Sequence, residues 1–169
     1  MRVRARGHRR RIRGVRAPLS RRAWQTRSAT VLIRPCAPDD DAQVVALWSE
    51  AGLTRPWNDP HKDLARARAV WPDLLLVAAD GDRVVGSVMA GYDGHRGWLY
   101  YLATAADRRG EGIGRRLIAE AETRLEALGC PKAMLMVRAD NEAVLAYYDA
   151  IGYQPETVRV AGHRLIPDD

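Results

Sequence analysis

The stretch that decides the fold is residues 99–117, which read LYYLATAADRRGEGIGRRL. It begins as an apolar run, passes through a turn with glycines at 110, 112 and 114, and continues as an amphipathic helix. Glycine lets a ligand approach the backbone closely. The first N–H groups of a helix lack internal partners and lie at the positive end of the helix dipole. With arginines on both sides, the stretch predicts a cradle for a phosphate or pyrophosphate.

The segments around this stretch predict an order of strands and helices. Apolar or β-branched runs predict strands, and apolar residues at helical spacing between capping residues predict helices. Turns at 80–82 and 92–97 predict that three consecutive strands pair as hairpins. The expected strands are 30–34, 73–79, 83–91, the run from 99, 132–137, a region from 153 and 158–166. The expected helices lie between 38–41 and Gly52, over 61–71, from the glycine turn to about Leu128, and from Asp140 or Asn141 to Gly152.

This order fits two common phosphate-binding folds badly. A dinucleotide-binding domain alternates strands and helices and carries GxGxxG directly after its first strand. Here three hairpin-linked strands precede the glycine turn. A P-loop needs Gly-Lys followed by Ser or Thr, which this turn lacks.

Two groups of residues resemble the GNAT acetyltransferase family. Its signature is Arg or Gln, two residues, Gly, one residue, then Gly or Ala at a strand-to-helix junction, where residues 109–114 read RGEGIG. The family also has an Asn, a Tyr seven residues later and then Gly-Phe or Gly-Tyr, which Asn141, Tyr148 and residues 152–153 match. Three further stretches resemble small bacterial members of the family: RPWNDP at 55–60, GYDGHRG at 91–97 and GCPK at 129–132.

The resemblance covers about residues 30–169 and implies one GNAT domain there. It implies an α+β fold of three layers, with helices on both faces of a mixed, mostly antiparallel sheet. The sheet is expected to splay between its fourth and fifth strands, with acetyl-CoA in the opening. No metal is expected.

By the same resemblance, particular residues would hold acetyl-CoA. The backbone of Leu102, Ala103 and Thr104 would pair with the pantetheine arm, and Asn141 would contact that arm or the adjacent loop. Tyr148 would lie near the thioester sulfur. Backbone N–H groups in the turn would hold the pyrophosphate; the residues are Arg109, Gly110, Gly112, Ile113, Gly114 and Arg115.

Acetyl transfer to an amine needs a neutral nucleophile, a polarised carbonyl and a proton for the departing thiolate. A backbone N–H near Leu102 could polarise the carbonyl. Tyr148 could give the proton as general acid. The alternative is that Tyr148 packs on the core side of its helix.

The base that would deprotonate the amine stays open among four residues: Asp93, His95, Asp59 and Glu50. Asp93 and His95 are also typical of an ordinary turn, and Asp59 is also typical of an ordinary helix cap. Family members that resemble the ribosomal-protein N-terminal acetyltransferases use a glutamate as the base. This chain has Met136 at that position, and a methionine side chain cannot accept a proton. This difference disfavours N-terminal acetylation through that base.

Acceptor specificity in the family is set by segments that correspond to residues 53–60 and 92–96. They supply Trp57 and Tyr92 together with three of the ionisable residues named above. An aromatic wall with carboxylates would suit a cationic amine. The alternative is that both aromatic residues only pack.

Composition limits the class of protein. The 169 residues suffice for one domain with a core, and no apolar run approaches the ~20 residues that span a bilayer. Cys36 and Cys130 are far apart and not at metal-ligand spacing, which predicts reduced thiols and a cytoplasmic location.

The net charge of +6 comes from the N-terminal segment. Residues 1–29 contain eleven arginines and no lysine or acidic residue, whereas residues 30–169 hold 16 basic and 21 acidic side chains, a formal charge of −5. We expect residues 1–29 to be a disordered extension. Polyanion binding through charge, a transit-like peptide and an extension without function are the alternatives, and the last is favoured.

The sequence thus predicts an acetyl-CoA-dependent N-acetyltransferase that transfers the acetyl group directly to a primary amine of a small molecule, peptide or lysine. The alternative is a non-catalytic acyl-CoA-binding regulatory module. The expected partners are acetyl-CoA and an amine acceptor, with no membrane and no nucleic acid except through residues 1–29. A homodimer stays open.

Overall fold

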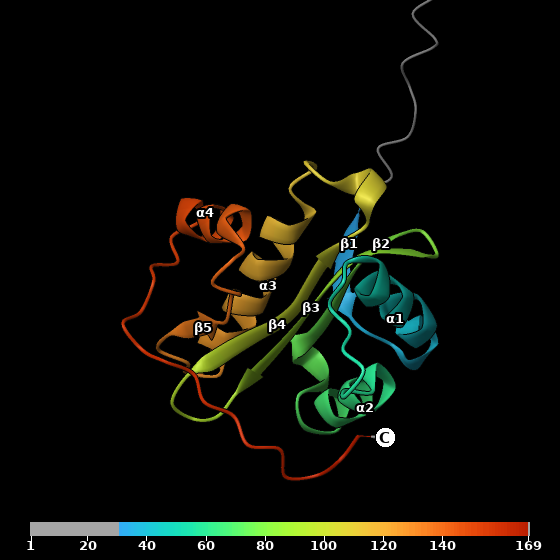
Figure 1. Ribbon diagram of the computed structural model, residues 1–169. Coiled ribbons are helices and arrows are strands. Elements are labelled where there is room, and N and C mark those ends of the chain that lie inside the picture. The colour runs from blue at the N-terminus through green and yellow to red at the C-terminus, as the bar shows by residue number, and fades with distance from the viewer. Residues whose placement is uncertain (1–30, 169) are drawn as a thin grey trace, which may run out of the picture.

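The computed structural model describes residues 31–168 and shows a five-stranded sheet with helices packed against it (Figure 1). The sheet order follows the chain, β1-β2-β3-β4-β5. Short 3-10 turns lie at Pro38–Asp40, Pro72–Leu74 and Ala106–Arg108. The strands are β1 Leu32–Pro35, β2 Leu75–Asp80, β3 Arg83–Tyr92, β4 Gly97–Thr104 and β5 Ala133–Leu135, and the helices are α1 Asp41–Glu50, α2 Pro60–Val70, α3 Ile113–Ala127 and α4 Glu142–Ala150.

The sheet is mixed and mostly antiparallel, and it opens between its last two strands. The pairings from β1 to β4 are antiparallel, and β4 and β5 are parallel. Only Gly97–Leu99 of β4 pair with β5, while β4 continues to Thr104. The expected mixed sheet and its splay between the fourth and fifth strands are confirmed.

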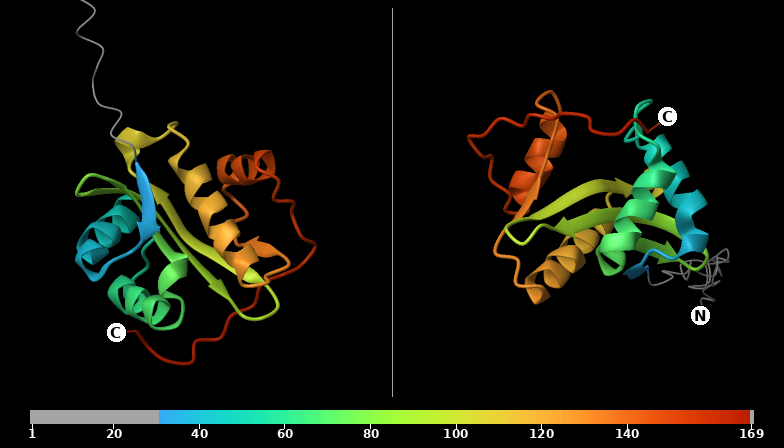
Figure 2. Two further views of the ribbon diagram at one scale, coloured as in Figure 1. Left: turned by 180° about the vertical axis from the view of Figure 1, so that it is seen from behind. Right: turned by 90° about the horizontal axis from the view of Figure 1, so that it is seen from below.

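Helices cover both faces of the sheet, as predicted (Figures 1 and 2). Neighbouring residues of β3 show the alternation, because successive side chains of a strand point to opposite faces. A Cβ on Gly86 would lie 2.9 Å from Cγ2 of Ile113 on α3. Ser87 faces the other way, and its Oγ accepts a 2.8 Å bond from Nε1 of Trp48 on α1. All of β2 from residue 75 to 79 is buried between these layers.

The ends of the helices follow the predicted capping residues. The side chain of Asp59 accepts from the N–H of His61 at 2.8 Å and begins α2. That of Asn141 accepts from the N–H of Val144 at 3.3 Å and begins α4. Gly129, with φ +81°, follows α3 in the left-handed conformation that commonly closes a helix.

The strands expected after Gly152 are wrong: residues 153–168 contain no strand. Because β5 has three residues where six were expected, a strand on its outer edge would gain few backbone bonds, and Pro155 has no N–H to give. The segment instead runs from α4 to α2 (Figures 1 and 2). Asp168 is ion-paired with Arg66 of α2 at its far end.

Two further predictions concern residues 1–29 and membrane-spanning segments. The expectation for residues 1–29 lies outside the described residues. Within residues 31–168, no helix is long and apolar enough to cross a membrane.

Candidate active site

The middle of β4 contains a bulge that the sequence analysis missed. Ser87 pairs with Ala103 and Met89 pairs with Tyr100, so two residues of β4 lie opposite one residue of β3. The first of these two is Tyr101, whose φ is +52°; no other non-glycine residue in 31–168 has a positive φ. Beyond this point β4 has no pairing with β5. The backbone of residues 102–104 therefore borders the opening in the sheet.

The glycine turn and the start of α3 lie directly after this part of β4. Gly110 and Gly112 have φ of +83° and +75°, and a Cβ on either would meet no heavy atom within 4 Å. The first N–H of α3 that bonds within the helix is that of Arg116, to the Gly112 carbonyl at 3.1 Å. The three N–H groups before it are those of residues 113–115, which lack intrahelical partners. Donors without intrahelical partners therefore lie next to the open glycine turn, at the positive end of a 15-residue helix.

The four arginines around the turn divide into two pairs. The Arg108 guanidinium donates to Glu111 at 2.9 Å and to Asp80 at 2.7 Å, and these hydrogen bonds raise the pKa of Arg108. They also fix the turn to the end of β2. Arg116 donates to the carbonyl of Val31 at 2.7 Å. Arg109 and Arg115 are exposed and form no ion pair with any residue of 31–168. Within residues 31–168, Arg109 and Arg115 are thus the two of these four arginines whose side chains have no hydrogen bond or ion pair.

Two adjacent tyrosines of α4 point to different places. A Cβ on Gly114 would lie 3.3 Å from the hydroxyl of Tyr147 and 3.6 Å from Oγ1 of Thr104, so Tyr147 reaches the junction of β4 and α3. The Tyr148 ring lies edge-on to Tyr147 and Tyr153, with centroids 5.3 Å and 5.7 Å away. Burial raises the pKa of Tyr148 to about 12, and its hydroxyl has no hydrogen-bond partner within the described range.

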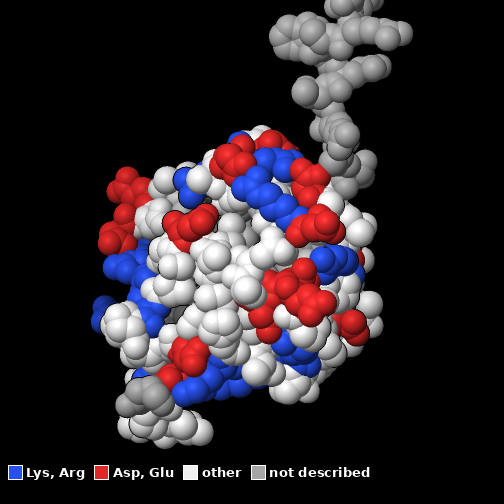
Figure 3. Space-filling model, turned by 90° about the vertical axis from the view of Figure 1, so that its right-hand side faces the viewer, with Lys and Arg blue, Asp and Glu red and all other residues white. Residues whose placement is uncertain are grey.

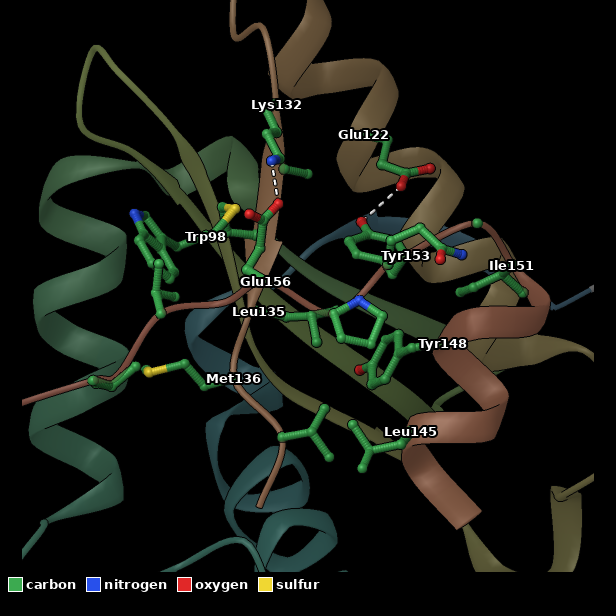
Figure 4. A pocket seen from close by; sticks show the side chains of 18 residues that line it. Trp98, Glu122, Lys132, Leu135, Met136, Leu145, Tyr148, Ile151, Tyr153 and Glu156 are labelled. Atoms are coloured by element: carbon green, nitrogen blue, oxygen red, sulfur yellow. Dashed lines mark hydrogen bonds and ion pairs between the residues drawn. The ribbon is translucent and has the colours of Figure 1, made fainter. Parts of the chain in front are cut away.

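Tyr148 lines a cavity of about 630 Å³ on the outer side of β5 (Figure 4). The cavity is bounded by β5, by α4 and by residues 152–160, and its lining includes Leu135, Met136 and Leu145. Two polar pairs lie at its edge, Lys132 with Glu156 and the Tyr153 hydroxyl with Glu122. It lies where the sequence predicted a further strand.

The structure separates two of the candidate bases from the opening. Asp93 accepts from the N–H groups of His95 at 2.8 Å and Arg96 at 2.6 Å, and these bonds lower its pKa. Both Asp93 and His95 precede β4, and Leu102 lies more than about 15 Å further along the strand at ~3.3 Å per residue. A carboxylate held as an anion in a turn at that distance cannot reach Leu102.

The other two candidates occupy ordinary positions. Asp59 caps α2, and the Asp168 side chain accepts its backbone N–H at 3.3 Å. Glu50 is exposed in the last position of α1. Among the residues that the structure describes, no hydrogen bond or ion pair joins any of the four candidate bases to the bulged residues.

A carboxylate that the sequence analysis missed does contact the bulge. The Tyr101 hydroxyl donates to Oδ2 of Asp63 on α2 at 2.7 Å, and burial and this carboxylate raise the pKa of Tyr101 to about 12. No local pattern could have found the pair, because it depends on the left-handed backbone at residue 101.

The two aromatic residues expected at the acceptor differ in exposure. Trp57, in the loop before α2, is 59% exposed. Tyr92 is partly buried against the core, and its hydroxyl donates to the Gly129 carbonyl at 3.4 Å. No ring contact joins them in the described structure, so they do not form one wall.

Within residues 31–168, no group of three or more His, Cys, Asp or Glu is arranged to hold a metal.

The sheet thus opens directly beside the glycine-rich start of a helix. Residues 42–153 match the acetyltransferase (GNAT) family, and the chain belongs to this family. An acetyltransferase of Sodalis glossinidius is 49% identical over 137 residues, which are 80% of this chain and 96% of that protein. The chain is therefore a GNAT-type acetyltransferase, and the family uses acetyl-CoA.

Solved structures share the fold at lower identity. A putative acetyltransferase from Agrobacterium tumefaciens has a TM-score of 0.64 at 19% identity and covers 79% of this chain and all of its own. The NatC complex bound to Gag peptide and CoA has a TM-score of 0.65 at 22% identity, over 75% of this chain and 86% of that chain.

Proposed function

We propose that the protein moves the acetyl group of acetyl-CoA directly to a primary amine of a small molecule or a peptide. The observation that carries this proposal is the coincidence of the β4 bulge, the open sheet and the free N–H groups of α3. A thioester with a long arm and a pyrophosphate matches these features in their order along the chain.

In this proposal, the backbone of residues 102–104 pairs with the pantetheine arm as an added strand would. The N–H groups of the glycine turn and of residues 113–115 hold the pyrophosphate, and the exposed Arg109 and Arg115 add positive charge. Asn141 acts by capping α4 and so fixes the helix that carries Tyr148.

The proposed chemistry uses these backbone groups together with Tyr148, which the family resemblance would place near the thioester sulfur. The Leu102 N–H would polarise the thioester carbonyl, and the neutral amine would attack its carbon to form a tetrahedral intermediate. When the C–S bond breaks, Tyr148 would give its proton to the thiolate. A pKa of about 12 keeps Tyr148 protonated at neutral pH, so its hydroxyl carries the proton that this step needs. The amine proton would leave to water, because no hydrogen bond or ion pair within residues 31–168 joins any of the four candidate bases to the bulge.

The proposal includes a cytoplasmic location and no metal. Cys36 and Cys130 are buried and unpaired, as expected of a protein that stays in a reducing compartment. The alternative, a regulatory module that binds acyl-CoA without turning it over, shares the cradle and differs only in the transfer step.

The test is thiol release from acetyl-CoA with a panel of small amines and amine-bearing peptides. We expect at least one amine to accelerate release, and the product to carry the acetyl group on nitrogen. Binding of acetyl-CoA without acceleration by any amine would favour the regulatory module.

The site is tested separately by Gly112→Ala, which would place a Cβ in the open space of the cradle and weaken CoA binding. Gly94→Ala is the matched control. Its φ is +87° and its Cβ would also meet no atom within 4 Å, but it lies in the turn before β4. Equal CoA affinity in the two variants would show that the pyrophosphate lies elsewhere.

A further inference from the structure

Tyr101 occupies a backbone conformation that side chains disfavour. At φ +52° it takes the place that glycine usually has in a bulge of this kind. A left-handed conformation is unfavourable for a residue with a Cβ, because the Cβ comes too close to the following carbonyl oxygen. Such a residue persists only where its surroundings hold it, and these residues gather at functional sites.

Three elements hold Tyr101 in this conformation. Its ring stacks on Trp48 of α1, with centroids 4.0 Å apart and planes 13° from parallel. Its hydroxyl donates to Asp63 of α2 at 2.7 Å. Its carbonyl accepts from Oγ of Ser87 on β3 at 3.4 Å, and the same Oγ accepts from Trp48 Nε1 at 2.8 Å. Trp48 and Ser87 are fully buried, so both are fixed by the core.

The conformation of Tyr101 decides where the next residues point. Tyr101 lies against α1, whereas Leu102 points to the other face, where its Cδ2 would be 4.0 Å from a Cβ on Gly114. Ala103 then returns to the register with Ser87. The extra residue thus turns the backbone at Leu102 at the place where the sheet opens. With a regular strand at this place, the Leu102 N–H would have a different direction.

We infer that Tyr101 is the positioning residue of the transfer site: held by Trp48, Ser87 and Asp63, it aims the Leu102 N–H at the thioester carbonyl. This inference rests on the proposed function and assigns a role to residues that lie outside the cradle. It predicts that the backbone conformation of residue 101 matters for the acetyl group and not for the pyrophosphate.

The test compares Tyr101→Gly with Tyr101→Ala. Both variants remove the ring and the hydroxyl, and they differ by one Cβ that penalises the left-handed backbone. Tyr100→Ala is the control, since Tyr100 has no positive φ and is partly exposed. Amide NMR spectra of each protein are recorded with CoA and with acetyl-CoA. Residues 113–115 report pyrophosphate binding, and Leu102 reports the acetyl group.

We expect the Leu102 amide to respond differently to CoA and acetyl-CoA in the wild type, in Tyr101→Gly and in the control, and to lose this difference in Tyr101→Ala. Residues 113–115 should respond to both ligands in all four proteins. An equal Leu102 difference in the glycine and alanine variants would overturn the inference. If residues 113–115 of the wild type do not respond, the proposed cofactor site itself is wrong.

Tyr101→Phe keeps the ring and removes only the bond to Asp63, and it guards against loss of folding in the smaller variants. We expect its kcat for thiol release to fall about threefold to tenfold, the worth of one hydrogen bond, with KM for acetyl-CoA unchanged. Asp63→Ala, which removes the acceptor, should give a similar loss, and the double variant should lose no more than either. An unchanged kcat in both single variants would contradict the role of this bond.

Discussion

At the scale of single residues, α4 shows what spacing can and cannot predict. Asp140 or Asn141 was predicted as the cap of this helix, and the structure shows that Asn141 is the cap. The spacing from Asn141 also selects Tyr148, whose catalytic role stays a prediction. Tyr147 was not predicted, although its hydroxyl reaches the cradle. Neighbouring helical residues point about 100° apart, and which one faces a ligand depends on how the helix packs.

Tyr148→Phe should lower kcat strongly and leave the affinity for acetyl-CoA nearly unchanged, because only the proton for the thiolate is lost. We expect a loss of roughly 10²-fold. Since the pKa of Tyr148 is raised to about 12, the wild-type rate should not fall through ionisation of this residue below about pH 10. Tyr100→Phe is the control. An unchanged kcat in Tyr148→Phe would contradict the assignment of Tyr148 as the acid. A wild-type rate that falls near pH 9 while the Tyr148→Phe rate does not would contradict the raised pKa.

Asp40 stabilises the fold through a pair that depends on pH. It is buried, it accepts from both terminal nitrogens of Arg34 at 2.6 Å and 2.9 Å, and the pKa of its carboxyl is lowered by that bond. Because this pKa is lower in the folded protein, the ionised carboxylate stabilises the fold at pH values above the pKa of the unfolded chain, about 4. This stabilisation is lost as the pH falls through the pKa of the folded protein.

Asp40→Asn should therefore reduce the free energy of unfolding by about 1–3 kcal/mol at pH 7. The difference from the wild type should shrink below about pH 4, measured by urea denaturation at several pH values. Asp39→Asn, at the exposed neighbouring position, should change little. A loss that is constant with pH would show that the charge of Asp40 is not the cause.

At the scale of elements, the helix starts and the hairpin-linked strands were predictable, because they depend on local residues. The bulge in β4 was not, because Tyr101 is held by side chains from three other elements. The strands predicted from residue 153 and over residues 158–166 include Val158 and Val160, which are 67% and 69% exposed. Alternating apolar residues can form a strand only where a partner edge is long enough, and β5 is too short.

The packing of α3 on the sheet is tested by Gly97→Ala. Its Cβ would lie 2.7 Å from Cδ1 of Leu125 and 3.0 Å from Sγ of Cys130. We expect a loss of about 1–3 kcal/mol in the free energy of unfolding, because the helix must shift. Gly91→Ala is the matched control: its nearest contact would be 3.7 Å away, on Trp71, and it should be nearly neutral. Equal stability of both variants would contradict the close packing of α3.

At the scale of the whole molecule, charge separates two parts of the chain. Residues 30–169 have a formal charge of −5, and acidic and basic side chains alternate closely on the face shown in Figure 3. The eleven arginines of residues 1–29 carry the excess positive charge. The matching relatives cover 80% of this chain and nearly all of their own length, so the family's fold does not need the remainder.

A protein that begins at Thr30 should release thiol from acetyl-CoA at the wild-type rate, within about twofold, because the cradle and α4 are intact. Its binding to DNA at low salt should be weaker than that of the full chain, since the DNA contact would come from the arginines. Filter binding at several salt concentrations measures this. Equal DNA binding by both proteins would place the contact on residues 30–169.

The central claim is that the opening beside the β4 bulge and the start of α3 hold one molecule of acetyl-CoA. A crystal structure of the complex with acetyl-CoA tests it most directly. We predict the pyrophosphate within hydrogen-bond distance of the N–H groups of residues 113–115, and the thioester carbonyl at the N–H of Leu102. A ligand that instead fills the cavity on the outer side of β5, with the glycine turn empty, would contradict the account.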